Sequence, residues 1–243
     1  MDPYIYGLYS LIYLFLFLWG LKLSIKNGFF SWLNVLLLVT YGLMYDNLVL
    51  AMGSVIGKGS LLEALNGMRY WFHAFFTPLL ILFSWAAIRK TGIRRLKGRA
   101  GFVLAGVFTL AMIIAELIQN TIGIKLEPAQ KYGVLNYESA GSHGPPVMII
   151  GVTAALLLAG IILWKKLKWK WMAVGVILMA IGSAVPIPLE SDAATNGFEL
   201  ILLISLWATK AFLEKIQISH DMRPDLIFLK QSLHFLCCQL FPR

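Results

Sequence analysis

Seven long apolar segments, separated by short polar stretches, constrain the fold of this chain more than any other feature of its sequence. Each segment has about 18–25 residues, the length with which an α-helix crosses roughly 30 Å of hydrocarbon. A backbone surrounded by lipid must satisfy its own hydrogen bonds, and this favours helices. We therefore predict an all-α fold, a bundle of seven transmembrane helices. The segments are residues 3–22, 29–53, 66–88, 100–123, 145–164, 171–188 and 197–216.

The composition supports burial in lipid. Hydrophobic residues make up 59% of the 243 residues and charged residues 14%, whereas a soluble domain has roughly 45–50% apolar and about 25% charged residues. A soluble core needs apolar residues on one face of each element, so the excess here must face lipid. We expect a multi-pass integral protein of the plasma (cytoplasmic) membrane, with membrane lipids as its partners.

The distribution of lysine and arginine predicts the orientation of the bundle. Loops on the cytosolic side of a membrane are enriched in these two residues. Seventeen of the 21 basic residues fall on one side, at 22–26, 89–99, 165–170 and from Lys210 onward. This places the N-terminus outside and the C-terminus in the cytosol. The net charge of +9 then reflects membrane topology, and we expect no nucleic-acid partner.

The sequence predicts two parts, a transmembrane domain at residues 1–218 and a cytosolic tail at residues 219–243. Two stretches outside the apolar segments, the tail and residues 124–144, have distinct sequence patterns. Leucines in the tail recur at three- and four-residue steps, which is typical of an amphipathic helix lying on the membrane surface. Cys237 and Cys238 would be candidates for palmitoylation there; the alternative is a tail without a defined role. The Gly-, Ser- and Pro-containing stretch 124–144 is predicted to be a turn-rich outer loop.

Three ionisable residues inside the predicted spans form the candidate catalytic group. Asp46, His73 and Glu116 belong to three different spans, and each lies about seven residues, or about 10 Å, from the predicted outer end of its helix. Charged residues inside a membrane are rare and generally face a protein interior or a water-filled cavity. We therefore predict a polar pocket in the outer half of the bundle, closed on the inner side by apolar packing.

Four further polar residues are predicted to bind substrate around this group: Arg69, Asn47, Asn120 and Glu199. Arg69 precedes His73 by one helical turn, on the same face, and its guanidinium group suits a phosphate or carboxylate. Pro78 is expected to kink the third span just below the pocket. Lys210, near the inner end of the last span, is expected to extend its ammonium group toward the cytosol.

These residue types allow several chemistries. An Asp46–His73 pair would fix the imidazole tautomer and leave the other ring nitrogen as a base. With Glu116 added, the same residues would form a set of ligands for a divalent metal with open positions. The cofactor is otherwise unknown. The sequence has no HExxH, GxSxG, glycine-rich phosphate loop or cysteine-based zinc pattern to make one chemistry specific.

Three functions remain open at this stage. The first is a membrane-embedded enzyme that acts on a lipid or amphiphilic substrate from the outer side. The second is a transport or sensing protein in which the same carboxylates bind protons or a small ligand. The third is a structural or assembly protein whose polar cluster only joins helices. The sequence does not fix the oligomeric state.

Overall fold

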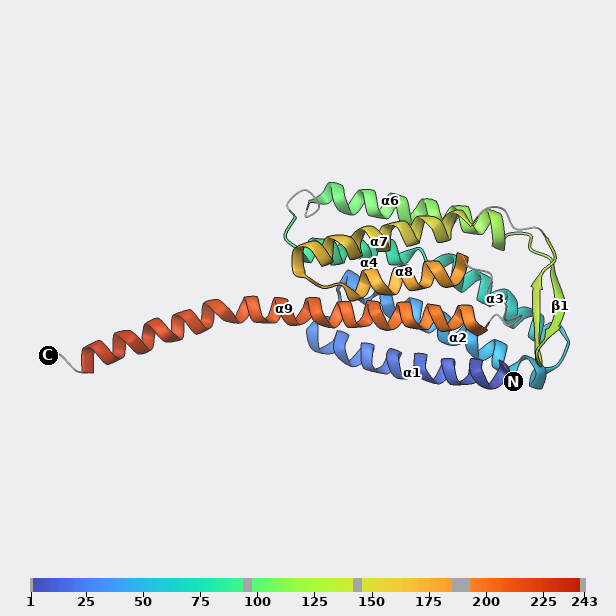
Figure 1. The fold of residues 1–243 in the computed structure, drawn as a ribbon, viewed down its shortest axis with the longest axis horizontal. Coiled ribbons are helices and arrows are strands. Elements are labelled where there is room, and N and C mark those ends of the chain that lie inside the picture. Colours follow the sequence, from blue (N-terminus) through green and yellow to red (C-terminus); the bar gives the residue numbers. More distant parts are fainter. Residues whose placement is uncertain (1, 94–97, 142–145, 185–192, 241–243) are drawn as a thin grey trace.

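The computed structural model describes residues 2–93, 98–141, 146–184 and 193–240, and most of these residues are helical (Figure 1). The helices are α1 (Asp2–Asn27), α2 (Val35–Ile56), α3 (Ser60–Phe76), α4 (Leu79–Lys90), α6 (Arg99–Glu116), α7 (Val147–Leu167), α8 (Trp171–Ala184) and α9 (Ala193–Leu240). A short 3-10 helix, η1 (Trp32–Asn34), precedes α2, and a π-helix, η2 (Leu117–Thr121), continues α6.

Six helical stretches are long and apolar enough to cross a membrane, which agrees with the prediction of a multi-pass membrane protein. They are Asp2–Lys26, Trp32–Ile56, Ser60–Lys90, Arg99–Thr121, Val147–Leu167 and Ala193–Ile216. The seventh predicted span corresponds to α8, which has 14 residues. At 1.5 Å per residue, a helix of that size is about 21 Å long, shorter than the ~30 Å of hydrocarbon. Residues 185–188, which were expected to complete it, lie outside the described residues.

The helices lie side by side with roughly parallel axes (Figure 1). The N-terminus of α1 and a β-hairpin lie at one end of the bundle, and the α7–α8 connection lies at the other. The second half of α9 continues beyond that other end. The orientation of the bundle in the membrane, with the N-terminus outside, stays a prediction.

Helix α4 is the centre of the core, because every residue from Leu80 to Ile88 is buried. A helix that is apolar on all sides is one that other helices surround. The helix is broken just before α4, at Thr77 and Pro78, which separate α3 from α4. The sequence predicts a kink at Pro78, and the structure has a break between two helices there, because proline has no N–H to donate to the preceding turn.

The third span begins at Ser60, six residues earlier than the predicted start at residue 66. The first turn of α3 carries the polar side chains of Ser60 and Glu63, and a hydropathy pattern therefore excludes it. Glu63 is exposed, whereas Asn66, one turn later, is fully buried and donates to the carbonyl of Leu62 at a distance of 2.8 Å. This shift in the start of the helix changes the depth of every residue on α3.

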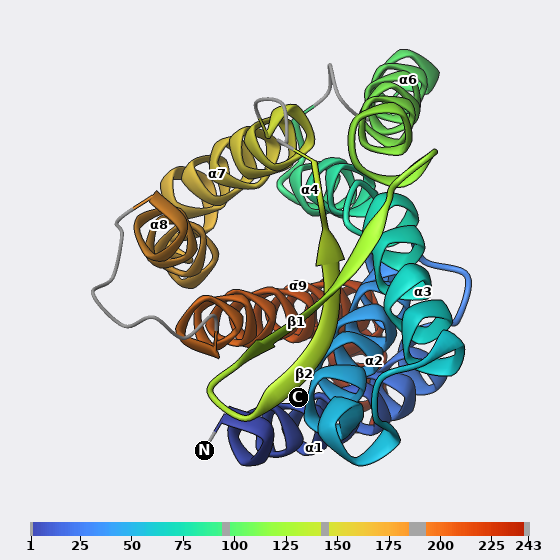
Figure 2. The same ribbon diagram turned by 90° about the vertical axis from the view of Figure 1, so that its right-hand side faces the viewer.

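The stretch 124–144 is more than the predicted turn-rich loop, because it adds one two-stranded hairpin to the mostly helical fold. Strands β1 (Leu126–Lys131) and β2 (Val134–Ser139) form an antiparallel hairpin. Tyr132 and Gly133 connect them with φ angles of 49° and 85°, the two positive values that a type I′ turn requires. Figure 2 shows the hairpin lying across one end of the bundle.

Apolar contacts hold the hairpin against the helices. Tyr137 of β2 packs with Val49 and Leu62, and Val134 packs with Tyr6 and Leu50. The carbonyl oxygen of Leu135 lies directly against Gly53 on α2, so closely that a β-carbon at Gly53 would overlap it. The hairpin is therefore a fixed cap over α2 and α3.

The last helix, α9, runs from Ala193 to Leu240 and passes through the predicted domain boundary at 218/219 without a break. Side chains beyond Ile216 are outside the description, so the amphipathic face and the palmitoylation of Cys237 and Cys238 stay predictions. The prediction for Lys210 is wrong. Its side chain is fully buried and pairs with Glu214 one turn later, at 2.7 Å. The ammonium group also lies 5.5 Å from the centre of the Trp207 ring, so its charge is stabilised inside the bundle.

Candidate functional site

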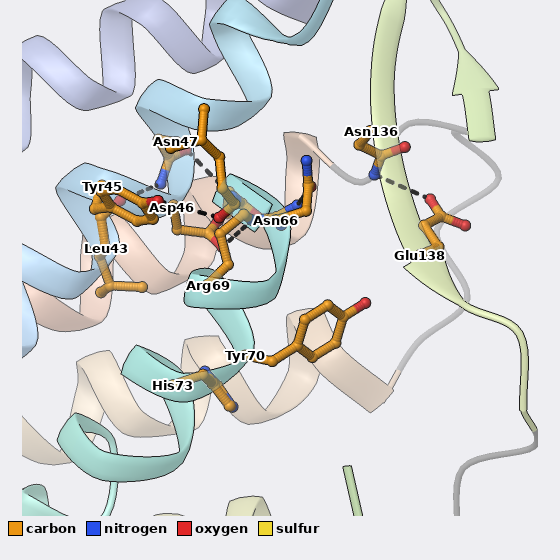
Figure 3. Close-up of polar contacts among 12 residues, drawn as sticks. Leu43, Tyr45, Asp46, Asn47, Asn66, Arg69, Tyr70, His73, Asn136 and Glu138 are labelled. Atoms are coloured by element: carbon orange, nitrogen blue, oxygen red, sulfur yellow. Dashed lines mark hydrogen bonds and ion pairs between the residues drawn. The ribbon is translucent and has the colours of Figure 1, made fainter. Parts of the chain in front are cut away.

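An ion pair between α2 and α3 forms the middle of the site. Arg69 Nε donates to Asp46 Oδ1 at 2.7 Å, and Arg69 Nη1 donates to Asn66 Oδ1 at 2.8 Å (Figure 3). Asp46 lies ten residues before the end of α2, and Arg69 nine residues after the start of α3. These positions are about 15 Å and 14 Å below the helix ends, so the two side chains meet at one level.

His73 does not pair with Asp46, contrary to the sequence-based prediction. Its Nδ1 atom lies 3.3 Å from the hydroxyl of Thr77, one turn further along the same region of the chain. The reason is the early start of α3: Arg69, rather than His73, reaches the depth of Asp46. His73 lies one turn deeper, as Figure 3 shows.

Two cavities share Asp46, Arg69 and His73 in their walls. The smaller has a volume of about 190 Å³ and lies between α2, α3 and α9. The larger has a volume of about 330 Å³ and lies between α2, α3, the α6–η2 junction and the start of α7. The other polar residues of the smaller cavity are Thr77, Asn196 and Glu199, and those of the larger are Tyr70, Glu116 and Asn120.

Glu116 is directed into the bundle by the buried face of α6. Gly101, Ala105, Thr109 and Glu116 are its buried residues, and their spacing of four, four and seven places them on one side of a helix. The π-helix begins at the next residue. Within it, Asn120 donates from Nδ2 to Glu116 Oε1 at 3.1 Å. Wider π-helical turns occur frequently at functional sites. The sequence pattern did not predict this π-helix.

Asn47 and Asn196 form a second link between helices. The Asn47 side chain is fully buried, donates to the Leu43 carbonyl at 2.8 Å and accepts from Asn196 at 3.1 Å. Asn47 does not line either of the two cavities described above, and its contacts join α2 to α9. Asn196 does line the smaller cavity. The sequence pattern did not reveal it because polar residues are common at the start of a span and do not by themselves indicate a functional site.

Glu199 lines the smaller cavity. Among the residues that the structure describes, no side chain or backbone group forms a hydrogen bond with its carboxyl group. The expected metal site is not assembled: within the described ranges, no three His, Cys, Asp or Glu side chains come together in a group that could hold a metal ion. Asp46, His73 and Glu116 therefore share a cavity wall without forming a set of ligands.

A third cavity of about 330 Å³ lies between η2 and the hairpin. Gln119, Lys125 and Ser139 are among its lining residues, and Asn120 belongs to it as well as to the larger of the two inner cavities. Asn120 therefore stands between the cap and the polar interior.

Comparison of the sequence with protein-family models and with curated proteins finds no match.

Proposed function

We propose that this membrane protein is an enzyme that acts on a lipid or another amphiphile reaching the polar cluster from the outer side of the membrane. The observation that carries the proposal is that Asp46, Arg69 and His73 line two adjoining cavities. Polar residues that only join helices form hydrogen bonds with one another and leave no cavity beside them. Here the ion pair coexists with unfilled volume beside it, and functional groups from four helices border that volume.

The contacts suggest a distinct role for each residue. Arg69 has five N–H donors, and the two hydrogen bonds to Asp46 and Asn66 leave others for a phosphate or carboxylate group. Asp46 would hold the guanidinium in place, which makes it a positioning residue. His73 and Glu116 would transfer protons, since both border the larger cavity and both residue types act as general acids and bases.

The walls of the larger cavity also suit an amphiphile. Pro146 and Ile149, at the start of α7, line it together with the polar residues. The apolar residues can contact an acyl chain, and the polar residues can contact a headgroup. The outer cavity beside the hairpin shares Asn120 with this one. A substrate would thus reach Glu116 from the capped end of the bundle, past the π-helix.

The test is lipid conversion by the purified chain in liposomes of phosphatidylethanolamine, phosphatidylglycerol and phosphatidylcholine, followed by mass spectrometry. We expect a time-dependent product that His73→Ala and Glu116→Gln each reduce by about 10²-fold or more, the usual contribution of a general acid or base. Glu63→Gln is the matched control, because Glu63 is an exposed acid in the first turn of α3. Unchanged lipids in all samples, or equal rates in all variants, would reject the proposal.

A specific observation also favours the transport or sensing alternative. Glu199, Lys210 and Glu214 are separated by eleven and four residues on α9, spacings that place them on one helix face. Polar groups therefore recur in the inner half, where Lys210 and Glu214 form a buried pair. This alternative predicts proton or solute flux across the same liposomes, abolished by Glu199→Gln.

A further inference from the structure

The smaller cavity has more acidic groups than permanently positive ones. Its walls contain two carboxyl groups, from Asp46 and Glu199, and one guanidinium group, from Arg69. The His73 imidazole also lines it, with Nδ1 3.3 Å from the Thr77 hydroxyl. The ion pair at 2.7 Å matches Arg69 with Asp46. Glu199 has no hydrogen-bonding partner in the described part of the chain. A charged group inside a membrane protein is costly without a counter-charge, so this carboxylate is the group that a ligand would complement.

The surroundings of Glu199 are those of a binding pocket for a small organic group. Phe72 and Phe76 on α3 stack at a centroid distance of 5.2 Å with an angle of 15° between their rings, and both line the cavity. Their side chains form an apolar wall for carbon atoms. Asn196 lines the same space and uses an Nδ2 hydrogen to bind Asn47.

A second, independent observation concerns Tyr13 on α1. Its side chain is fully buried and its hydroxyl group has no hydrogen-bond partner among the described residues. A buried hydroxyl without a partner costs about 1–3 kcal/mol, and the bundle packs α1 against α2, the helix that contributes Asp46 to the cavity. The Tyr13 hydroxyl is thus a second polar group of this part of the bundle that makes no hydrogen bond among the described residues.

The volume sets the size of the ligand. The smaller cavity measures about 190 Å³, and a protein cavity of roughly 150 Å³ can hold a benzene molecule. A group of six or seven non-hydrogen atoms would therefore fit, while a whole lipid would not.

We propose that the smaller cavity binds an organic ammonium group of the ethanolamine or choline type, with the positive charge beside Glu199 and the methylene or methyl carbons against Phe72 and Phe76. Arg69 borders both cavities, and its remaining donors suit the phosphate of the same headgroup. The inference rests on the proposed function and names its substrate class: an amphiphile whose headgroup carries both an ammonium and a phosphate group.

The test is thermal unfolding of the full-length chain in maltoside detergent with increasing choline. The control ligand is dimethylbutanol, in which carbon replaces the quaternary nitrogen. We expect choline to raise the unfolding temperature in a saturable manner and dimethylbutanol to have no such effect. Glu199→Gln should weaken the apparent affinity for choline about tenfold or more, the loss expected when a charged partner is removed. Glu63→Gln, which changes an exposed acid that lines neither cavity, should leave it unchanged.

Equal stabilisation by dimethylbutanol, an unchanged affinity in Glu199→Gln, or no binding of choline to the parent chain would overturn the inference. Native mass spectrometry after exposure to phosphatidylcholine and phosphatidylglycerol distinguishes a lipid headgroup from a free amine. Preferential retention of phosphatidylcholine identifies a lipid, while choline binding without it identifies a free amine. Binding does not require turnover, so choline binding without lipid conversion would reject the enzyme and keep the ammonium site.

Discussion

Arg69 Nε donates to Asp46 Oδ1 at 2.7 Å, and this contact joins α2 to α3 in the wall shared by two cavities. The pair is only partly enclosed, since the side chains of Arg69 and Asp46 are 17% and 25% exposed. The exposed parts border the cavities. The same contact can therefore stabilise the bundle and present a guanidinium group to a ligand.

The first prediction concerns the contribution of the Arg69–Asp46 pair to the stability of the bundle. Asp46→Asn and Arg69→Gln should each destabilise the protein by about 1–3 kcal/mol, the usual range for a hydrogen bond to a charged group. The double variant should lose less than the sum of the single losses, because the second substitution has no pair left to break. Unfolding in mild detergent gives all three values, and strict additivity would show that the two side chains do not interact.

His73 and Glu116 should behave differently in the same measurement. Both face a cavity, and residues kept for function are commonly placed at a cost to stability. His73→Ala and Glu116→Gln should therefore unfold at or above the temperature of the parent chain. If both unfold well below it, the cluster serves to join helices, and the proposal of an enzyme should be abandoned.

Gly53→Ala should displace the hairpin. A β-carbon at Gly53 would overlap the carbonyl oxygen of Leu135, a backbone atom that cannot move aside by itself. We expect a lower unfolding temperature and faster proteolysis between β1 and β2. Gly106→Ala on α6 is the matched control. A β-carbon there meets no atom within 4 Å, and alanine has the higher helix propensity, so this variant should be neutral or slightly more stable.

Lys210→Met should destabilise the bundle around the buried pair that Lys210 forms with Glu214. Lys210 and Glu214 have side-chain exposures of 0% and 8% and lie 2.7 Å apart, so the substitution leaves the carboxylate without its ammonium counter-charge. Removing one member of a buried pair typically costs about 3–5 kcal/mol. The double variant Lys210→Met/Glu214→Met should recover much of that loss. A Lys210→Met variant as stable as the parent would contradict the prediction and show that the pair does not contribute to the stability of the bundle.

Cysteine labelling tests the orientation and the seventh crossing together. With seven crossings and the N-terminus outside, a membrane-impermeant maleimide applied to intact cells should label Lys131→Cys in the hairpin. It should not label the native Cys237 and Cys238, which the same topology places in the cytosol. If α8 does not cross, the number of crossings becomes even and the two native cysteines become reactive from outside. Lysed cells provide the positive control for both sites.

The sequence by itself determined the class of this protein. Runs of apolar residues such as those of α6 and α7 are long enough to span a bilayer, and lipid permits only structures that satisfy their own backbone hydrogen bonds. The break at Pro78 was predictable for a similarly local reason, the missing N–H of proline. The rare charged residues within the apolar segments also identified the region where the cavities lie, since Asp46 and His73 line both.

Only the tertiary structure decided which of these residues meet. Depths counted from hydropathy paired Asp46 with His73, but the polar first turns of α3 shift the helix start to Ser60 and bring Arg69 to Asp46. The hairpin depends on two positive φ angles and on contacts with residues distant in sequence, such as Gly53. The burial of Lys210 depends on its neighbours in the bundle. Helix formation is local, whereas the register between helices follows from the packing of the whole bundle, which hydropathy does not record.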